Sequence, residues 1–584
     1  MFQLMRAGSS LTIAGAAASM REFASQFRAY FLYAGFFSLI INLLMLAPAL
    51  FMLQVFDRVV SSRSGETPVM LFVLTLLALF FMAFLDAIRT RLLTRAAIRL
   101  EKLLGPRVLA SMLRKSAHAN SSPAQYGLRD INALRGFLTG PGIIAIFDAP
   151  WVPLFIVVIY LFHPTLGVVA LLGALLLLGL AVLNERLSRR SLAAMQTDAR
   201  IAGRFVDQTL GNAEVVGALG MADNVTQDWR EMSEKVLKSQ FEATQVGSLL
   251  TSTTRFLRQI LQVIMLAVGA WLTIEQLSTP GIMIAATIVL GRALAPVESL
   301  IAGWKSLVDA RGAYGRLSQL IASEAKAPDP MKLPPPKGIL TVENVVFGFR
   351  GQDLPIIRRV SLAVQPGTSL GIVGPSAAGK STLARLIVGV WQPIAGAVRL
   401  DGADIRSWPR ERLGPYIGYL PQNVEIFAGT VSANIARLGH VNSEAVIKAA
   451  TRANAHEMIL ALPQGYDTLV GEGGALLSAG QRQRLALARA LYGNPKLVVL
   501  DEPNSNLDHA GEAALAEAVR QLREDRVTLV VISHRLPLLA TMDKVMVLMQ
   551  GSVKKYGTLA EVLPRPSQAP ADQRVVAAKI VPRG

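Results

Sequence analysis

The sequence contains no cysteine among its 584 residues. The absence of a thiol excludes disulfide bonds, zinc sites with cysteine ligands and catalysis by a cysteine nucleophile. It leaves the compartment open, because a chain without thiols is compatible with oxidising and with reducing surroundings. Any reaction carried out by this chain must therefore rely on other side chains.

Charged residues are also scarce, at 17%, whereas hydrophobic residues make up 52% and the mean hydropathy is positive. A chain of this length exceeds one hydrophobic core, since domains usually hold about 100–200 residues. The composition therefore favours a membrane protein with more than one domain. Basic residues exceed acidic ones by 59 to 41, which gives a net charge of +18. Such an excess is typical either of nucleic-acid binding or of the cytoplasmic flanks of membrane spans.

Six stretches approach the roughly 20 mostly apolar residues that a membrane-spanning helix needs. They are Tyr30–Leu53, Pro68–Leu85, Ile143–Leu161, Thr165–Leu183, Phe256–Ile274 and Pro280–Pro296. Polar residues weaken the last two, chiefly Arg258 in the fifth and Arg292 in the sixth, so a pair of buried soluble helices is the alternative there. We favour six spans, because the distribution of basic residues requires both segments to cross.

Lys and Arg residues gather after the second and fourth spans, which indicates that these connections are cytoplasmic. They are Arg89, Arg91, Arg95, Arg99, Lys102 and Arg107, then Arg186, Arg189, Arg190, Arg200 and Arg204. Both termini are therefore expected in the cytoplasm. Most of the positive charge belongs to membrane topology, and no nucleic-acid partner is expected. We expect the two connections to continue the spans as helices that turn near Ser121–Arg129 and Val206–Leu219.

Composition predicts five segments along the chain. Residues 1–28 lack the apolar centre of a signal peptide and predict a short cytoplasmic segment. Residues 29–323 form the transmembrane domain, and residues 324–338, with five prolines, predict an extended linker. Residues 339–563 alternate strand and helix patterns, as in an α/β domain. Residues 564–584 form a basic tail for which disorder is the default expectation.

Three ionisable residues lie near membrane depth, where charged side chains often mark a translocation path. They are Asp148 in the third span and Arg292 and Glu298 around the end of the sixth. The alternative is that Asp148 caps a helix before Pro150 while Arg292 extends to the inner interface. We favour this alternative.

A predicted buried strand at Ser369–Gly374 leads into the sequence GPSAAGKST and then into an apolar helix. This order of strand, G-x-x-x-x-G-K-S and helix is the phosphate-binding loop in the context that it requires. Its glycines let backbone N–H groups face the phosphates, aided by the helix N-terminus. The predicted nucleotide-binding residues are Gly374, Pro375, Ser376, Ala377, Ala378, Gly379, Lys380, Ser381 and Thr382. Lys380 is expected to neutralise the β- and γ-phosphates, and Ser381 to ligate Mg²⁺.

A second predicted buried strand, Leu497–Leu500, ends in the pair Asp501-Glu502. Carboxylates at the carboxyl end of such a strand face the ligand crevice of the sheet. Asp501 is therefore placed to bind Mg²⁺ and its water, and Glu502 to act as general base on the attacking water. A surface turn is the alternative for an isolated Asp-Glu pair, but the preceding strand and the P-loop make it improbable.

The segment LSAGQRQR, Leu477–Arg484, resembles the signature motif of ATP-binding-cassette (ABC) proteins, which usually reads LSGGQ. The residues that match the motif are Ser478, Ala479, Gly480 and Gln481. Ala479 stands where the family usually has glycine, which puts the hydrolysis rate in question. In the family this segment faces the γ-phosphate held by the partner subunit.

The other ABC motifs are also present. Gln422 in GYLPQ matches the Q-loop, which touches the metal, Asp508 in SNLD matches the D-loop, and His534 in ISHRL matches the switch histidine. Phe349 matches the aromatic residue that stacks on adenine, with Phe347 as its competitor. The resemblance covers nearly the whole chain. It implies an α-helical six-span transmembrane domain of the ABC exporter type followed by an α/β P-loop nucleotide-binding domain.

The resemblance implies an ATPase that works as a homodimer, in which two ATP molecules lie between P-loop and signature of opposite subunits. Lys380, Mg²⁺ and the opposite Ser478 and Gly480 would stabilise the γ-phosphoryl charge. Glu502 and His534 would position water, and cytoplasmic helix tips would transmit the motion.

Four stretches resemble the protease-secretion branch of type I secretion ATPases. They are Met52–Ser64, Phe147–Phe155, Tyr419–Ala436 and Asp501–Asp508. This resemblance implies a multi-pass protein of the bacterial inner membrane that exports an unfolded protein with an uncleaved C-terminal signal. It also implies a periplasmic membrane-fusion adaptor and an outer-membrane channel as partners. Asp57 and Arg58 would face that adaptor or form a local ion pair.

Two other functions remain open at this stage. One is an exporter of membrane lipid or small hydrophobic molecules. The other is a regulatory ATPase or gated channel that moves nothing uphill. Trapping of lipid without polypeptide would favour the first, and hydrolysis uncoupled from substrate the second.

Overall fold

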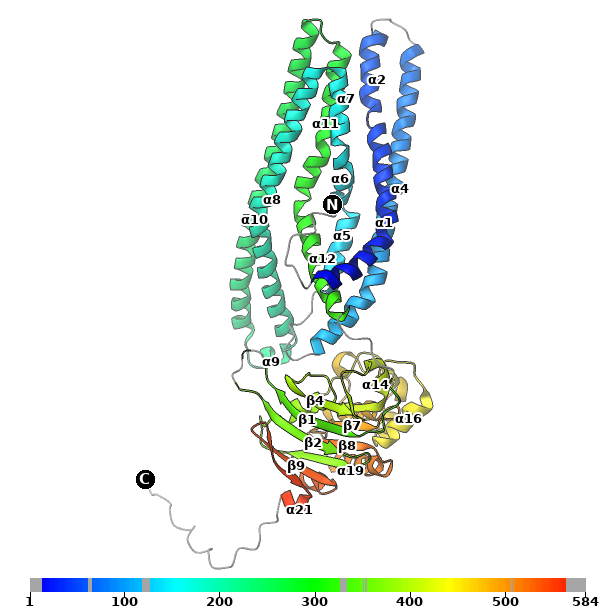
Figure 1. Ribbon diagram of the computed structural model, residues 1–584, viewed down its shortest axis with the longest axis vertical. Coiled ribbons are helices and arrows are strands. Elements are labelled where there is room, and N and C mark those ends of the chain that lie inside the picture. The colour runs from blue at the N-terminus through cyan, green and yellow to red at the C-terminus, as the bar shows by residue number, and fades with distance from the viewer. Residues whose placement is uncertain are drawn as a thin grey trace, which may run out of the picture. The chain divides into compact units, whose positions relative to one another are not determined.

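The computed structural model describes residues 13–60, 66–117, 127–325, 333–349, 351, 354–505, 507 and 509–562. The chain separates into two compact units, one formed mostly by residues before Ala327 and the other mostly by residues after Lys326, and each has its own hydrophobic cores. Figure 1 shows helices in the first unit and a mixture of helices and strands in the second. The predicted tail falls outside the described residues.

The first unit is helical throughout its described residues. Its elements are α1 (Ile13–Leu44), α2 (Ala47–Gln54), the π-helix η1 (Val55–Val59), α4 (Glu66–Ala117), α5 (Gly127–Thr139), α6 (Pro141–Asp148), the 3₁₀ helix η2 (Ala149–Trp151), α7 (Val152–Phe162), α8 (Pro164–Leu210), α9 (Ala213–Ala218), α10 (Ala222–Ile274), α11 (Pro280–Ala302) and α12 (Trp304–Ala325). Two of the predicted segment boundaries differ from those in the structure. Residues 13–28 already belong to α1, and α12 continues to Ala325, past the predicted start of the linker.

Among the described residues, six helical segments are long and apolar enough to cross a membrane, and together they contain all six predicted spans. They are Gln26–Val59, Glu66–Ala117, Pro141–Phe162, Pro164–Leu210, Ala222–Ile274 and Pro280–Ala302. In the most apolar 18-residue stretch of α4, no residue is buried within the chain. In the corresponding stretch of α11, half of the residues are buried. Helix α11 is therefore central to this unit, and α4 presents its apolar surface outward, as a helix in lipid does.

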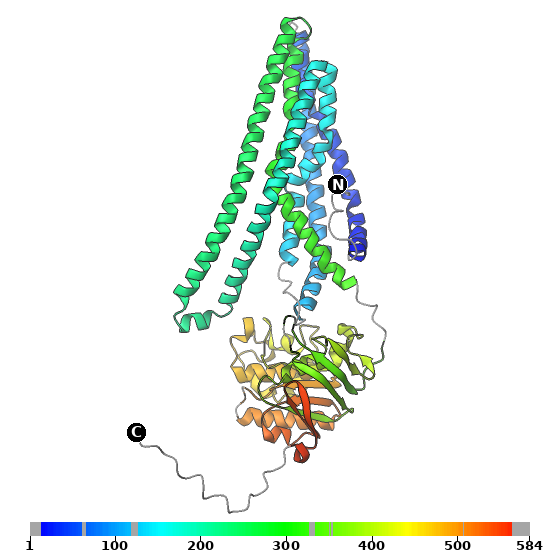
Figure 2. The ribbon, with the colours of Figure 1, turned by 60° about the vertical axis from the view of Figure 1, so that its left-hand side comes forward.

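Three helices are far longer than a bilayer requires. Helices α4, α8 and α10 have 52, 47 and 53 residues. At 1.5 Å per residue, α10 extends roughly 80 Å, against about 30 Å of hydrocarbon. Helices α8 and α10 lie side by side and are joined through α9 (Figure 2), which confirms the turn predicted near Val206–Leu219. The turn predicted near Ser121–Arg129 lies mostly outside the described residues.

A buried ion pair replaces the helix cap expected at Asp148. Asp148 ends α6, and its carboxylate accepts hydrogen bonds from Arg89 of α4 at 2.7 Å and from Asn42 of α1 at 3.1 Å. Asp148 makes no side-chain bond to the helix N-terminus that follows, so the capping interpretation is wrong. The Arg89 side chain is 4% exposed and also bonds Ser38 of α1. One carboxylate thus joins three helices.

The other ionisable residues singled out in the spans are placed differently. Glu298 forms ion pairs with Arg255 and Arg258 of α10, at 3.3 and 3.0 Å. Arg292 is exposed on α11. Asp57 accepts hydrogen bonds from the Thr279 hydroxyl and the Gly281 N–H, and so binds the first turn of α11.

In its described residues, the second unit contains two sheets. Their strands are β1 (Leu340–Phe347), β2 (Ile357–Val364), β3 (Ser369–Val373), β4 (Ala395–Leu400), β5 (Ala403–Asp404), β6 (Ile417–Leu420), β7 (Leu497–Asp501), β8 (Thr528–Ile532), β9 (Lys544–Met549) and β10 (Ser552–Gly557). One sheet is antiparallel in the order β2-β1-β4-β5. The other has the order β10-β9-β3-β8-β7-β6 and is parallel except for β10.

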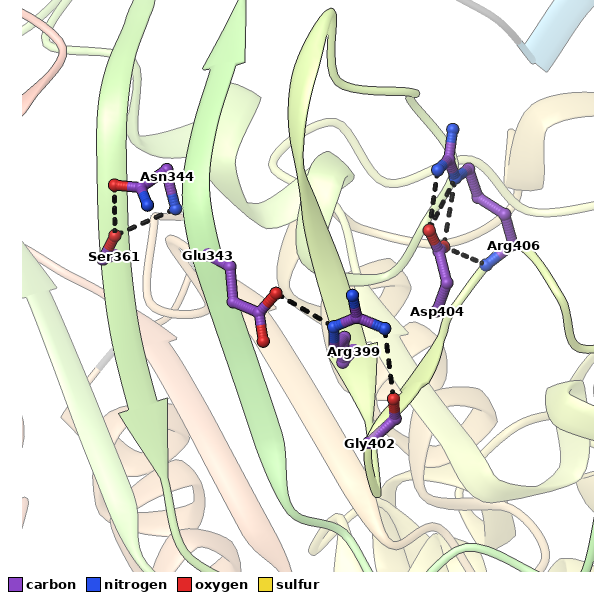
Figure 3. Close-up of polar contacts among 7 residues, drawn as sticks. All are labelled: Glu343, Asn344, Ser361, Arg399, Gly402, Asp404 and Arg406. Atoms are coloured by element: carbon purple, nitrogen blue, oxygen red, sulfur yellow. Dashed lines mark hydrogen bonds and ion pairs between the residues drawn. The ribbon is translucent and has the colours of Figure 1, made fainter.

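Polar side chains stabilise the antiparallel sheet (Figure 3). Glu343 of β1 pairs with Arg399 of β4 at 2.9 Å, and Arg399 also bonds the carbonyl of Gly402. Asn344 adopts a left-handed φ of 46° beside a bulge in β1, where its N–H and its side chain both bond Ser361 of β2. Asparagine tolerates this conformation better than most residues, so the bulge has a local cause.

This unit also contains helical segments, of which some pack on the parallel sheet and others on one another. They are α13 (Lys380–Ile387), α14 (Arg410–Leu413), η3 (Gly414–Tyr416), α15 (Val431–Ile435), α16 (Ser443–Arg452), α17 (His456–Leu460), η4 (Gly465–Asp467), η5 (Glu472–Gly474), α18 (Ala479–Leu491), α19 (His509–Glu524), α20 (Leu536–Leu539) and α21 (Leu559–Val562). Strands β7 and β8 are buried along their whole length, which explains their unbroken apolar sequences. Because β3, β7 and β8 are parallel neighbours, the loops after them meet at one edge.

Candidate nucleotide site

The P-loop follows β3 and leads directly into α13. A Cβ atom at Gly374 would lie 2.0 Å from the Leu548 carbonyl oxygen, so only glycine fits there. Ala377 and Gly379 adopt left-handed φ angles of 63° and 96°, a conformation that lets the backbone turn tightly between β3 and α13. The predicted phosphate-binding segment therefore has the backbone shape that its sequence indicates.

Lys380 begins α13 and folds back over the loop. Its ammonium group donates hydrogen bonds to the carbonyls of Gly374 and Pro375, at 2.8 and 3.0 Å. Burial lowers the pKa of Lys380, and the nearby carboxylates of Glu502 and Asp501 oppose that shift. A phosphate group near this ammonium would offer a stronger partner than two carbonyls, because both members of the pair would be charged.

Asp501 lies at the end of β7 next to Ser381. The Ser381 hydroxyl donates to one carboxylate oxygen of Asp501 at 3.2 Å. The other oxygen is buried and has no hydrogen-bond partner in the described part of the chain. Burial raises the pKa of Asp501, and the bond from Ser381 acts against that rise. A hydroxyl beside a carboxylate with one unused oxygen is a donor set that fits Mg²⁺.

Glu502 is faced by two other residues of the predicted site. The Gln422 amide donates to one carboxylate oxygen at 3.0 Å, and Nε2 of His534 lies 3.8 Å from the other. The structure therefore brings Gln422, Glu502 and His534 together from loops after three different strands. The distance from His534 is longer than a hydrogen bond and leaves the carboxylate open on that side.

The backbone at Glu502 is held from several directions. Glu502 has a left-handed φ of 49°, a conformation that costs about 1–3 kcal/mol in a residue other than glycine. Its N–H donates to the Ile532 carbonyl at 2.9 Å. The Gln483 amide of α18 donates to the carbonyls of Glu502 and Pro503. The sequence indicated no role for Gln483, because neither its burial nor its bonds to a distant loop can be read from the local pattern.

Aromatic residues cluster at one edge of this unit. Phe347 is 1% exposed and stacks on Trp391, with ring centroids 5.2 Å apart, so it belongs to the core. Phe349 is partly exposed and meets Phe347 and Trp391 edge to face. Of the two candidates, Phe349 is therefore the one with a ring surface available to a base. Trp391, which the sequence analysis did not consider, also carries the Arg385 guanidinium 4.6 Å from its ring centre.

The signature residues form a self-contained helix start. Ser478 is the N-cap of α18 and forms a capping box with Gln481, with hydrogen bonds of 2.8 and 3.2 Å. Ser478 and Ala479 are exposed, and Gly480 is partly exposed. Ser478 and Gln481 thus bond one another. Six other residues of the predicted site come together at the edge of the parallel sheet, namely Lys380, Ser381, Gln422, Asp501, Glu502 and His534. Asp508 lies outside the described residues.

Comparison with known proteins places both units in one family. The model of the ABC transporter transmembrane region matches residues 31–294, and the ABC transporter model matches residues 357–505. The structure is similar to a bacterial Atm1-family ABC exporter with ATP bound, with a TM-score of 0.82, 24% identity and coverage of 93% of this chain and 97% of that one. At this identity the similarity supports the fold.

Two relatives are similar over most of the chain. The type I secretion system ATP-binding protein PrsD of Rhizobium meliloti (strain 1021) is 40% identical over 559 residues, covering 95% of this chain and 96% of the relative. The cyclolysin secretion/processing ATP-binding protein CyaB of Bordetella pertussis is 31% identical over 535 residues, covering 89% and 74%. The chain therefore belongs to the type I secretion ATPases of the ABC transporter family, which bind ATP and couple its hydrolysis to transport.

Proposed function

We propose that this chain exports an unfolded protein, one that carries an uncleaved C-terminal signal, across the bacterial inner membrane. The observation that carries this proposal is the 40% identity, over almost the full length of both chains, to a protein of a type I secretion system. A relative named for a translocated RTX toxin, from Actinobacillus pleuropneumoniae, is 28% identical over 93% of the chain and points to cargo of the same kind. These relatives are named for secretion or for toxin translocation, which favours protein export over export of lipid or small molecules.

In the proposed reaction, Lys380 and the P-loop N–H groups bind the phosphates of ATP, and Phe349 stacks on the adenine. Ser381, Gln422 and Asp501 would hold Mg²⁺, which neutralises charge on the phosphates. Glu502 accepts a proton from the attacking water, and its contact with Gln422 keeps the carboxylate oriented. His534, close to the other carboxylate oxygen, helps to fix the water.

The arrangement of the signature supports a homodimer as the working unit. Ser478, Ala479 and Gly480 start a helix whose first turn is exposed, and a helix start of this kind favours an anionic ligand. In the proposed dimer, this helix start and Asp508 complete the nucleotide site of the partner subunit. Each dimer then has two composite sites, and closure of both is driven by ATP.

The proposed export route needs further proteins. A periplasmic membrane-fusion adaptor and an outer-membrane channel would continue the path beyond the inner membrane. Both termini are proposed to be cytoplasmic, so that the ATPase unit meets its nucleotide there. Asp57 is tied to α11 and so would present a fixed outward surface near Arg58 to the adaptor.

The proposal is tested by purifying the Glu502→Gln variant from native membranes with Mg-ATP and identifying co-purifying proteins by mass spectrometry. The variant keeps the shape of the site but removes the base, so the ATP-bound complex should accumulate. A periplasmic adaptor together with one large secreted protein is the expected result. Preparations without ATP provide the control. Recovery of lipid and homodimer alone, at good yield, would refute protein export and favour a lipid or small-molecule exporter.

A further inference from the structure

Gln483 connects two parts of the ATPase unit that are separate in sequence. Its side chain is buried, with 2% exposure, on α18, the helix that begins with the signature residues. Its amide nitrogen donates to the Pro503 carbonyl at 2.5 Å and to the Glu502 carbonyl at 3.3 Å. A buried amide donor thus bonds two carbonyls of the loop that carries Glu502, the proposed general base.

This loop depends on such contacts because its conformation is unfavourable by itself. The φ of 49° at Glu502 persists only where surrounding bonds impose it. The Ser505 N–H also donates to the Glu502 carbonyl, at 3.2 Å, and the Ser533 hydroxyl donates to the Asn504 side chain, also at 3.2 Å. Among these contacts, the bonds from Gln483 come from the signature helix.

The helix gives Gln483 a mechanical link to the signature. Gln483 is five residues after Ser478, so the two lie about 7.5 Å apart along the axis of one helix. The Ser478–Gln481 capping box makes the first turn part of that rigid helix. A shift of the helix start therefore moves the Gln483 amide, and with it the carbonyls that it holds.

We propose that Gln483 is a positioning residue that couples the signature of each subunit to the general base of the same subunit. This inference rests on the proposed homodimer, in which the signature serves the nucleotide bound by the partner and Glu502 serves the nucleotide bound by its own P-loop. Engagement of ATP at one composite site then sets the position of Glu502 in the other. Gln483 touches neither nucleotide and acts through Glu502.

Two substitutions separate this role from simple packing. Gln483→Met keeps the volume but removes the donor, so kcat for ATP hydrolysis should fall roughly 10- to 100-fold at an unchanged KM, as expected when a reacting group is misplaced by about 1 Å. Gln483→Glu places an acceptor against two carbonyls when ionised and a donor when protonated. Burial favours the protonated form.

The Gln483→Glu variant is therefore expected to show a distinctive pH profile of kcat. The ratio of its kcat to that of the unmodified chain should rise as pH falls from about 8.5 to 6, because protonation restores one hydrogen bond. The same ratio for Gln483→Met should stay flat. Gln521→Met is the matched control and should leave kcat unchanged, because the side chain of the half-buried Gln521 of α19 bonds only Glu517 of the same helix among the bonds described for it.

All variants are measured as the full chain in lipid nanodiscs, with fluorescence of a bound ATP analogue to establish that the site is intact. A flat pH ratio for Gln483→Glu, or variants that hydrolyse ATP normally, would overturn the role of Gln483 alone. The Glu502→Gln chain is tested in parallel for ATP-dependent dimer closure. If it binds ATP without closing, both the proposed dimer mechanism and the coupling are refuted.

Discussion

The buried ion pair in the membrane unit yields a prediction whose size follows from its geometry. Asp148→Ala removes the carboxylate that accepts from Arg89 at 2.7 Å and from Asn42 at 3.1 Å. Arg89, whose side chain is 4% exposed, would keep its bonds to Ser38 and to Asp86, but the Asp86 side chain is 50% exposed. The substitution thus leaves the buried guanidinium of Arg89 with one carboxylate partner, Asp86, in place of two.

Loss of one partner of a buried ion pair costs about 3–5 kcal/mol, because the remaining charge stays desolvated. The remaining contact with Asp86 places the expected loss at the low end, about 3 kcal/mol. For a unit of this size, that loss corresponds to a fall in Tm of roughly 6 °C. Replacing both charges, as Arg89→Met with Asp148→Asn, should recover at least about 2 kcal/mol, since no buried charge is then left unpaired.

Thermal unfolding followed by tryptophan fluorescence measures the effect, because Trp151 lies in η2, directly after α6. Glu101→Ala is the matched control. It breaks a pair of similar length, 2.6 Å to Arg135, whose side chains are 45% and 43% exposed. Exposed pairs contribute about 0–1 kcal/mol, so this change should shift Tm by at most about 2 °C. Equal shifts for Asp148→Ala and Glu101→Ala, or a double variant less stable than either single one, would refute the reasoning.

Three further predictions concern single side chains. Lys380→Met should lower the rate of phosphate release roughly 100-fold or more, because the site loses its buried cation, while the melting temperature changes little. Asp501→Asn should raise the Tm of the ATP-free chain at pH 7. Burial raises the pKa of Asp501 in the folded state above its value in the unfolded chain. The contribution of Asp501 to folding stability is therefore fully present below the unfolded pKa and is lost as pH rises through the folded pKa. The Asn variant escapes this loss, so its Tm advantage should vanish in acid, and an advantage that persists there would contradict this account. Asp57→Ala should cost about 1 kcal/mol through the lost bonds to Thr279 and Gly281, and Asp57→Asn less, as measured by thermal unfolding.

The fold class was predictable because its signals are local. Six apolar stretches of spanning length and a strand leading into GPSAAGKST each specify their own structure within a few turns or strands of chain. The grouping of Lys380 with Asp501 was also predictable, since parallel strands deliver the loops after their carboxyl ends to the same edge. Their residue-level roles remain predictions, although the geometry around them supports the chemistry assigned.

Contacts between distant segments could not be predicted in the same way. Asp148 and Arg89 are 59 residues apart, and nothing in the sequence near Asp148 distinguishes a helix cap from a cross-helix ion pair. The choice is decided by which helices pack together, and that depends on the whole unit. Gln483 was overlooked for the same reason, because its partners lie 19 and 20 residues later in a different loop.

The two halves of the proposed composite site differ in how complete they are within one chain. At the P-loop edge, an Asp501 oxygen is buried without a partner among the described residues, and Lys380 is satisfied only by two carbonyls. At the signature, Ser478 and Gln481 satisfy each other and the helix start is exposed. Unsatisfied buried groups are costly, so the first half gains most from a charged ligand. Nucleotide should therefore bind first at the P-loop, and the already stable signature helix should join it afterwards from the partner.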